Sequence, residues 1–446
     1  MPFIPATEQN RKEMLKAIGV SEFEDLLQDI PEHLRLAGSL DLPESMSELE
    51  ISSYIEELAG LNANTGTHVC FLGGGAYDHF IPAAIDHLIS RSEFYTSYTP
   101  YQPEVAQGNL QTIYEYQSMI AELTGMDVAN ASMYDGGSAL AEAALLVCGH
   151  TGRSDILLSK SVHPYYREVV KTYCHKSGIH VNEINIRNGV TDISQLKTAV
   201  GSNSAGLLLQ HPNFFGILEP VETAESIIHA AGGLYVISSD PISLGILKPP
   251  GDFGADVVTG EAQALGNPLN FGGPYIGLFA VNRTLVRRLP GRLVGVTRDA
   301  QDRRGYVLTL QTREQHIRRD KATSSICTNE QLCALASAIY LALLGKKGLQ
   351  KVADLCIQKS HYLADEIQKI EGFSLRFDQP FFKEFLIQCP IPPREIIDRL
   401  LNQKLFAGID ISRFDYQMDD TLLIAVTEKR TRSDMDRFVT ALKALV

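Results

Sequence analysis

Two short apolar runs stand at the centre of the sequence. The first is Leu234-Tyr235-Val236-Ile237, which continues through Ser238-Ser239 to Asp240, and the second is Ala255-Asp256-Val257-Val258. Apolar runs of this length that end in polar or turn-forming residues are typical of buried strands. A glycine-rich turn, Phe271-Gly272-Gly273-Pro274, follows them. We therefore expect two strands here, with the carboxylate of Asp240 at the end of the first.

Strand and helix patterns alternate on both sides of these runs. This alternation predicts an α/β fold with a mostly parallel, doubly wound sheet. Strands are expected at 155–159, 180–186, 205–209, 234–237 and 275–281, and helices at 164–174, 193–200, 221–231 and 283–289.

The chain is too long for one ordinary core, and three regions differ in pattern. Residues 1–60 form an expected helical arm, with helices at 8–18, after Ser21 and at 47–58, which cannot build much core alone. Residues 61–328 form the expected large domain. Residues 329–446 form an expected small α+β domain, with helices at 329–344, 349–370, 393–401 and 433–445 and strands at 373–377, 382–388 and 421–426.

Composition limits the class of partner. The net charge is −13, with no block of basic residues, which argues against nucleic acid and anionic membranes as partners. Seven cysteines are scattered without a CxxC pair or zinc-ligand spacing, so we expect reduced thiols, no metal site and a cytoplasmic location. The N-terminus lacks the pattern of a signal peptide.

A candidate anion site precedes the first of the alternating strands. A long amphipathic helix is expected at 104–123, ended by Gly125, and Asp135-Gly136-Gly137-Ser138 then opens a helix at 139–147. Free N–H groups and the helix dipole at such a turn favour an anion. Many helices begin this way without binding phosphate, so both interpretations stay open.

Two polar segments are further candidates for a binding wall. One holds Tyr95, Tyr98, Tyr101 and Gln102, and is either an ordered surface loop or the wall of a pocket or interface, since tyrosine supplies both area and a hydroxyl. The other, 291–328, is rich in arginine, including Arg298 and Arg313. A connection this long without an evident core role is usually functional.

The central layout resembles that of fold-type I enzymes that use pyridoxal phosphate (PLP). The resemblance implies that Asp240 would face the pyridinium nitrogen, that Asp135–Ser138 would hold the phosphate, and that His163 would stack on the ring, although His163 could equally cap a helix. The Schiff-base lysine would fall within Thr259-Gly260-Glu261-Ala262-Gln263-Ala264-Leu265, which contains no amine. We therefore expect a vestigial pocket without covalent PLP.

Several longer runs resemble signature stretches of the P-protein family of the glycine cleavage system. The resemblance covers essentially the whole chain. The runs are Ile4–Glu8, Glu13–Gly19, Phe71–His79, Tyr98–Glu104, Tyr134–Ser138, Gly291–Thr297 and Tyr306–Arg319. The length and the missing lysine are similar to the branch in which this protein is split into two subunits, and match its first, α, subunit.

This resemblance implies a non-catalytic α subunit of glycine dehydrogenase (decarboxylating). The β subunit would carry PLP and bind glycine, release its carboxylate as CO₂, and pass the aminomethyl group to the lipoyl arm of the H-protein. The family implies an α₂β₂ assembly. The tyrosine loop would close the partner's site, and Arg298 and Arg313 would steer a carboxylate or the acidic carrier.

Three alternatives remain open. The chain could be an autonomous PLP enzyme, such as an aminotransferase or decarboxylase, but Lys248 lies too close to Asp240 and Lys321 too far along the chain. It could hold PLP non-covalently as a structural ligand. It could also be a scaffold unrelated to glycine, which only the signature runs oppose.

Overall fold

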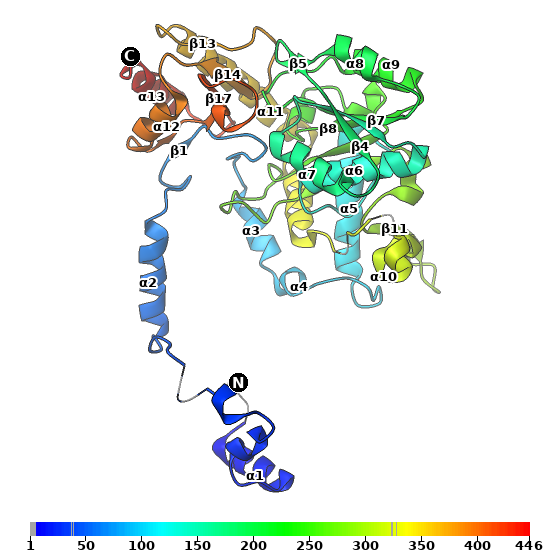
Figure 1. The fold of residues 1–446 in the computed structure, drawn as a ribbon, viewed down its shortest axis with the longest axis vertical. Coiled ribbons are helices and arrows are strands. Elements are labelled where there is room, and N and C mark those ends of the chain that lie inside the picture. The colour runs from blue at the N-terminus through cyan, green and yellow to red at the C-terminus, as the bar shows by residue number, and fades with distance from the viewer. Residues whose placement is uncertain (1–5, 37, 39, 323, 327) are drawn as a thin grey trace. The chain divides into compact units, whose positions relative to one another are not determined.

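The computed structural model describes residues 6–36, 38, 40–322, 324–326 and 328–446, and the chain divides into two compact units, 1–63 and 64–446 (Figure 1). The start of the quoted run at Ile4 and the thiol of Cys327 lie outside the described residues. The six other cysteines are free. A separate domain at 329–446 stays a prediction.

The first unit is an arm of short helices. Helix α1 (Glu8–Ile18) begins at a capping box formed by Thr7 and Asn10, and α2 (Glu48–Gly60) begins at one formed by Ser47 and Glu50. Both helices agree with the expected ones, whereas the segment after Ser21 is a 3₁₀ turn, Phe23–Leu27. No described residue of this unit is buried.

The second unit is built on a seven-stranded sheet of order β2-β10-β9-β8-β7-β3-β4. Neighbours from β9 to β4 pair in parallel, and β10 is antiparallel to both β9 and β2. The expected mostly parallel sheet is confirmed. Its strands are β2 Val128–Ala129, β3 Asp155–Ser159, β4 His180–Ile184, β7 Ser204–Gln210, β8 Leu234–Ser238, β9 Val257–Glu261 and β10 Gly277–Val281.

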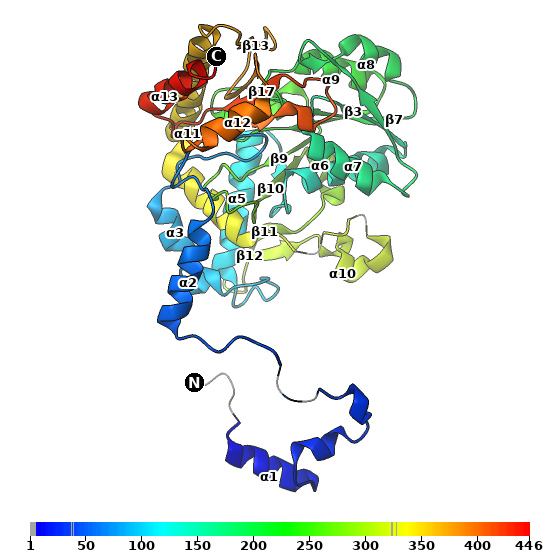
Figure 2. The same ribbon diagram turned by 60° about the vertical axis from the view of Figure 1, so that its left-hand side comes forward.

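Helices cover both faces of this sheet, as Figure 2 shows. Alternate residues of β8 enter different cores, with Tyr235 and Ile237 on one face and Val236 on the other. The first core includes α5 (Gln107–Thr124), α8 (Ile193–Ala199), α9 (Val221–Ala230) and α11 (Gln331–Gln368), and the second includes α6 (Gly136–Thr151) and α7 (Pro164–Cys174).

Helix α11 combines the two helices expected at 329–344 and 349–370. Gly345 leaves helical geometry inside it, at φ 57° and ψ −175°. By length and composition α11 would be long and apolar enough to cross a membrane, yet core helices of other proteins have the same features. Because Ala334, Tyr340, Ala353 and other residues of α11 pack in the first core, we interpret it as a core helix.

The C-terminal part adds a second, antiparallel sheet of order β13-β14-β17-β16. Helices α12 and α13 and the second half of α11 pack against it. The elements are β13 Ser374–Leu375, β14 Glu384–Gln388, α12 Pro393–Leu401, β16 Ile409–Asp410, β17 Thr421–Ala425 and α13 Arg432–Lys443. A short parallel pair joins β1 (Val69–Cys70) to β15 (Leu405–Phe406).

The arginine-rich segment contains elements that the sequence pattern did not predict. Strands β11 (Leu293–Arg298) and β12 (Arg304–Thr309) form a hairpin, and the short helix α10 (Gln315–Arg318) follows. The periodicity also missed α3 (Ala83–Ile89), α4 (Ser92–Tyr95) and the small hairpin of β5 (Ile186–Arg187) and β6 (Val190–Thr191). The helix expected at 283–289 is a 3₁₀ turn, Arg283–Arg288.

Candidate functional site

The expected anion cradle forms the N-terminus of α6. Asp135 is the N-cap residue, and its Oδ1 accepts a hydrogen bond from the Ser138 backbone N–H at 2.6 Å. A Cβ atom added to Gly136 would lie 2.7 Å from the Tyr166 hydroxyl, so only glycine fits there. The helix end that the sequence predicted as an anion site is therefore formed, with its N–H groups facing the end of β9.

Glu261, at the end of β9, fills this cradle with its carboxyl group. Its carboxylate accepts hydrogen bonds from the backbone N–H groups of Gly136 at 3.0 Å, Gln263 at 2.9 Å and Ile276 at 3.2 Å. Burial raises the pKa of Glu261 to about 8, although these N–H groups act in the opposite direction. From the sequence we could see that Glu261 stands where a Schiff-base lysine was expected. The sequence did not show that the Glu261 side chain would bind the N-terminus of α6.

Asp240 follows β8 and is paired within the chain. Its Oδ2 lies 2.6 Å from Nζ of Lys383, whose side chain is almost fully buried just before β14. The Lys383 ammonium also lies 3.5 Å from the centre of the Tyr77 ring and 3.1 Å from Nε2 of His79. The sequence analysis missed Lys383 because it lies 143 positions after Asp240 in the chain.

His163 caps helix α7. Its Nδ1 accepts a hydrogen bond from the Tyr165 N–H at 3.1 Å, so its Nε2 carries the proton and donates to the Gly74 carbonyl at 2.7 Å. Burial lowers the pKa of His163 to about 4, which keeps the ring neutral. One face of the ring stacks on Tyr166, with centroids 4.6 Å apart.

A third buried carboxyl group, that of Glu384, connects the C-terminal sheet to the loop at residues 73–77. Glu384 accepts hydrogen bonds from the Gly74 N–H and from the Tyr77 hydroxyl, both at 2.7 Å. Burial raises the pKa of Glu384 to about 7. Glu384 is the first residue of β14 and directly follows Lys383, the partner of Asp240. The Gly74 carbonyl, in the same loop, accepts the hydrogen bond from His163.

One group among the described residues has metal-ligand chemistry that the sequence spacing did not indicate. Ligand atoms of His79, Cys356 and Glu428 lie within 4.8 Å of one another. His79 Nδ1 is 2.6 Å from Glu428 Oε2, and its other nitrogen faces the Lys383 ammonium. Both His79 nitrogens therefore already have partners inside the protein.

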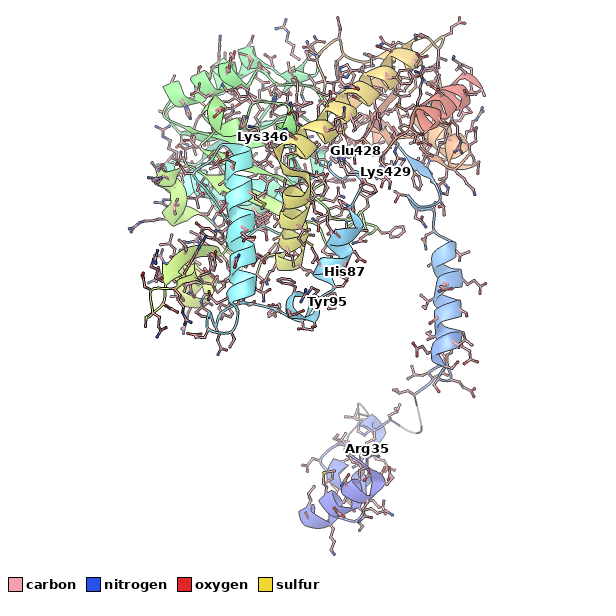
Figure 3. The ribbon with its side chains drawn as sticks, turned by 180° about the vertical axis from the view of Figure 1, so that it is seen from behind. Arg35, His87, Tyr95, Lys346, Glu428 and Lys429 are labelled. Atoms are coloured by element: carbon pink, nitrogen blue, oxygen red, sulfur yellow. The ribbon has the colours of Figure 1, made fainter. Side chains whose placement is uncertain are left out.

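The predicted Tyr101 joins the tyrosine loop to the arginine-rich segment, through two residues that were not predicted as site residues, Arg292 and His316. The Tyr101 hydroxyl accepts a hydrogen bond from Arg292 Nη2 at 3.1 Å, and His316 lies edge-on to the Tyr101 ring at 5.8 Å. Tyr95 and Tyr98 are exposed, as is Gln102. Figure 3 shows Tyr95 well apart from Glu428 and thus from the buried network that Glu428 joins.

The two predicted arginines have different environments. Arg298 forms an exposed ion pair with Asp302 at 3.0 Å within the β11–β12 hairpin. Arg313 is partly buried, and its Nε and Nη2 have no hydrogen-bond partner among the described residues. These two nitrogens form one edge of the guanidinium, which is the edge that binds carboxylates with two parallel bonds.

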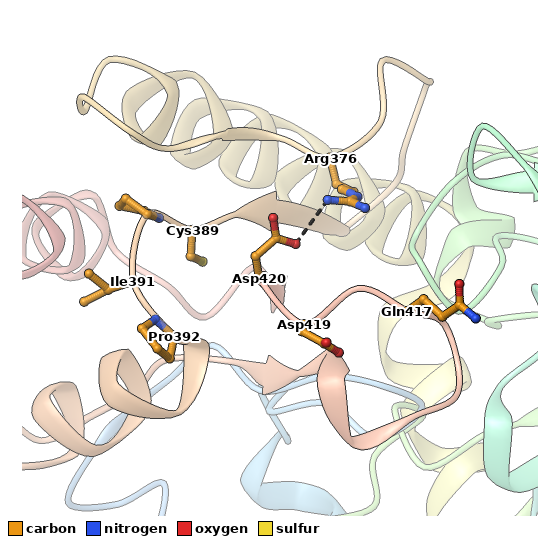
Figure 4. Close-up of a pocket in the computed structure, with 8 residues that line it drawn as sticks. Arg376, Cys389, Ile391, Pro392, Gln417, Asp419 and Asp420 are labelled. Atoms are coloured by element: carbon orange, nitrogen blue, oxygen red, sulfur yellow. Dashed lines mark hydrogen bonds and ion pairs between the residues drawn. The ribbon is translucent and has the colours of Figure 1, made fainter.

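A surface hollow of about 490 Å³ lies on the C-terminal sheet (Figure 4). Its lining includes Arg376 and Asp420, which are paired at 3.1 Å, with Gln417 and Asp419. None of the residues predicted from the sequence lines it, so it does not bear on the site described above.

The residues of the pocket do not fit PLP. A phosphate at the N-terminus of α6 would meet the carboxylate of Glu261, and a pyridinium nitrogen at Asp240 would meet the ammonium of Lys383. At the first position the N–H groups already bind the Glu261 carboxyl group, and at the second two positive charges would lie close together in a buried site, which is unfavourable. The one pocket amine among the described residues, Lys383, is held at the Asp240 end, where the cofactor's ring nitrogen rather than its aldehyde would lie.

A family model described as "Glycine cleavage system P-protein" matches residues 1–442. The chain belongs to this family. A probable glycine dehydrogenase (decarboxylating) subunit 1 from Chloroherpeton thalassium is 53% identical over 445 residues, which cover 100% of both chains. The family expected from the signature runs is thus confirmed.

Solved structures agree with this P-protein assignment. The crystal structure of a glycine decarboxylase (P-protein) of the glycine cleavage system, in inhibitor-bound form, is 41% identical, covers 100% of both chains and has a TM-score of 0.92. Mouse CSAD in apo form has a TM-score of 0.68 at 16% identity, covering 95% of this chain and 92% of that one, and so shows the fold alone. The expected fold-type I α/β class is confirmed.

Proposed function

We propose that this chain is the non-catalytic α subunit of a two-subunit glycine dehydrogenase (decarboxylating), the subunit that lacks the Schiff-base lysine. The observation that carries this proposal is the filled pocket, in which Glu261 and Lys383 take the places of the cofactor's phosphate and ring nitrogen. The subunit number in the relative's name supports the existence of a partner chain.

In this proposal the chemistry takes place on the partner β subunit. That subunit holds PLP, decarboxylates glycine with release of CO₂, and transfers the aminomethyl group to the lipoyl arm of the H-protein. We propose an α₂β₂ assembly in the cytoplasm. The dispersed cysteines, six of which are free thiols in the structure, support a reducing compartment.

This chain's own contribution to the assembly would be a binding wall. The loop with Tyr95, Tyr98, Tyr101 and Gln102 would face the partner's site, and Arg298 would lie near it on the hairpin. The free guanidinium edge of Arg313 would take a carboxylate, since a pair of parallel N–H donors in a partly buried place is costly to leave unpaired.

The location of PLP is tested by absorption spectroscopy and reductive labelling. This chain, the β subunit and their mixture are each incubated with PLP, reduced with borohydride and mapped by peptide mass spectrometry. We expect the label on the β subunit alone. A label on Lys383, or on any other lysine of this chain, would overturn the proposal.

The binding wall is tested by glycine–bicarbonate exchange in the assembled complex. We expect Arg313→Ala to lower exchange by at least about tenfold, because a bidentate contact to a carboxylate is lost. Tyr101→Phe should lower it less, since only the hydroxyl is removed. Arg303→Ala is the matched control, because Arg303 forms an exposed ion pair with Asp299 on the β11–β12 hairpin, which precedes Arg313 in the same arginine-rich segment. If Arg313→Ala leaves both exchange and H-protein binding unchanged, the proposed role of Arg313 in binding a carboxylate is wrong.

A further inference from the structure

The N-terminal unit exposes an unusual share of the chain's large apolar side chains. Of the 31 such side chains that are exposed among the described residues, 16 lie between Met14 and Leu61. The unit contains no buried residue among those described, so it has no core of its own. Apolar surface gathered in this way marks a site of interaction.

Helix α2 presents part of this surface as one continuous stripe. Ile51, Tyr54, Ile55 and Leu58 follow the spacing i, i+3, i+4 and i+7, which places them on one face of the helix, and each is between 41% and 53% exposed. Helices that lie in an apolar groove of a partner use this spacing for their anchors. The opposite face carries Ser53 and Glu56.

Charge indicates what kind of surface covers the stripe. Residues 1–63 contain 13 acidic and four basic side chains, a net charge of −9, whereas the remaining 383 residues have a net charge of only −4. Two copies of the arm would repel each other, and the chain's own second unit is also acidic overall. A groove with basic residues at its rim complements the arm best.

We propose that the stripe of α2, formed by Ile51, Tyr54, Ile55 and Leu58, docks into an apolar, basic-rimmed groove of the β subunit. This inference rests on the proposed function, because that function supplies the partner. The arm then acts as a clasp between the subunits, and its apolar side chains become buried when the complex forms. Subunit recognition is thereby separated from the filled pocket, which lies in the other unit.

The test compares the same added charge on the two faces of α2. Binding of the purified β subunit to the full-length chain is measured by surface plasmon resonance for the wild type, Ile55→Glu and Ser53→Glu. We expect Ile55→Glu to raise Kd at least tenfold, because a charge enters the groove, and Ser53→Glu to change it less than about threefold. Neither change removes a core side chain, and circular dichroism checks that the helix content is kept.

The outcomes separate this inference from the proposed function. If the wild-type chain does not bind the β subunit, the proposed function itself fails. If the wild type binds and Ile55→Glu binds equally well, the docking site is wrong while the function stands. If the wild-type chain alone forms a dimer that Ile55→Glu dissociates, the stripe binds a second copy and the inference is overturned.

Discussion

At the scale of single residues, the buried ion pair of Asp240 and Lys383 occupies the place where the sequence predicted a vestigial cofactor pocket. Removing one partner of a buried ion pair leaves an uncompensated charge, which costs roughly 3–5 kcal/mol. Lys383→Met should therefore lower the free energy of unfolding by about 3 kcal/mol, measured by urea denaturation followed by circular dichroism. Adding Asp240→Asn should restore part of the loss, since no charge is then left unpaired.

The control for this change is an ion pair on the surface. Lys351 and Asp354 are 3.2 Å apart and largely exposed, so Lys351→Met should cost less than about 1 kcal/mol. Equal losses in Lys351→Met and Lys383→Met would show that burial gives the pair with Asp240 no special role.

Glu261 gives the pocket a dependence on pH. Burial raises its folded pKa to about 8, against about 4.3 for an unfolded glutamate, so between these values the folded chain binds the proton and the unfolded chain does not. Its contribution to stability is thus present at low pH and is lost as the pH rises toward 8, with a slope of at most about 1.4 kcal/mol per pH unit.

The variant Glu261→Gln isolates this contribution. Other buried carboxyls, such as Glu142 and Glu384, titrate in both proteins and cancel in the difference between them. Urea denaturation at several values between pH 5 and 8 should show the wild type losing stability relative to Glu261→Gln as the pH rises. Parallel pH profiles would refute this assignment.

At the scale of elements, Gly345 interrupts the helical geometry of α11 and so separates its two halves. With φ 57° and ψ −175°, Gly345 occupies a region almost confined to glycine, and no atom lies within 4 Å of an added Cβ. Gly345→Ala should thus cost about 1–3 kcal/mol through backbone strain alone. Gly149→Ala, inside α6, is the control and should be neutral or stabilising, because helical alanine is favoured over glycine and the nearest atom is 3.5 Å away. Thermal unfolding of both variants distinguishes these outcomes.

The elements also show what the sequence could and could not predict. Strands such as Asp155–Ser159 and helices such as Pro164–Cys174 agreed with prediction because their apolar pattern is local. The hairpin of β11 and β12 was missed because the segment was interpreted from its arginines, although short apolar runs in it bury Val294, Tyr306 and Leu308. The anion cradle could be predicted from Asp135–Ser138, but its filling by Glu261 depends on a contact between residues 125 positions apart.

At the scale of the whole molecule, the two units should respond differently to protease. The first unit contains no buried residue among those described, so local opening there costs little free energy, and trypsin should cut the free chain at sites such as Arg35 before it cuts the second unit. The trimmed chain should melt within about 2 °C of the intact one, because the core of the second unit is built from residues beyond 63. Time-resolved digestion with mass spectrometry, followed by calorimetry of the product, measures both effects.

A large fall in melting temperature after cleavage would show that the arm stabilises the second unit of the free chain. If the arm instead clasps the β subunit, adding that subunit should slow cleavage at Arg35 for the wild type but much less for Ile55→Glu.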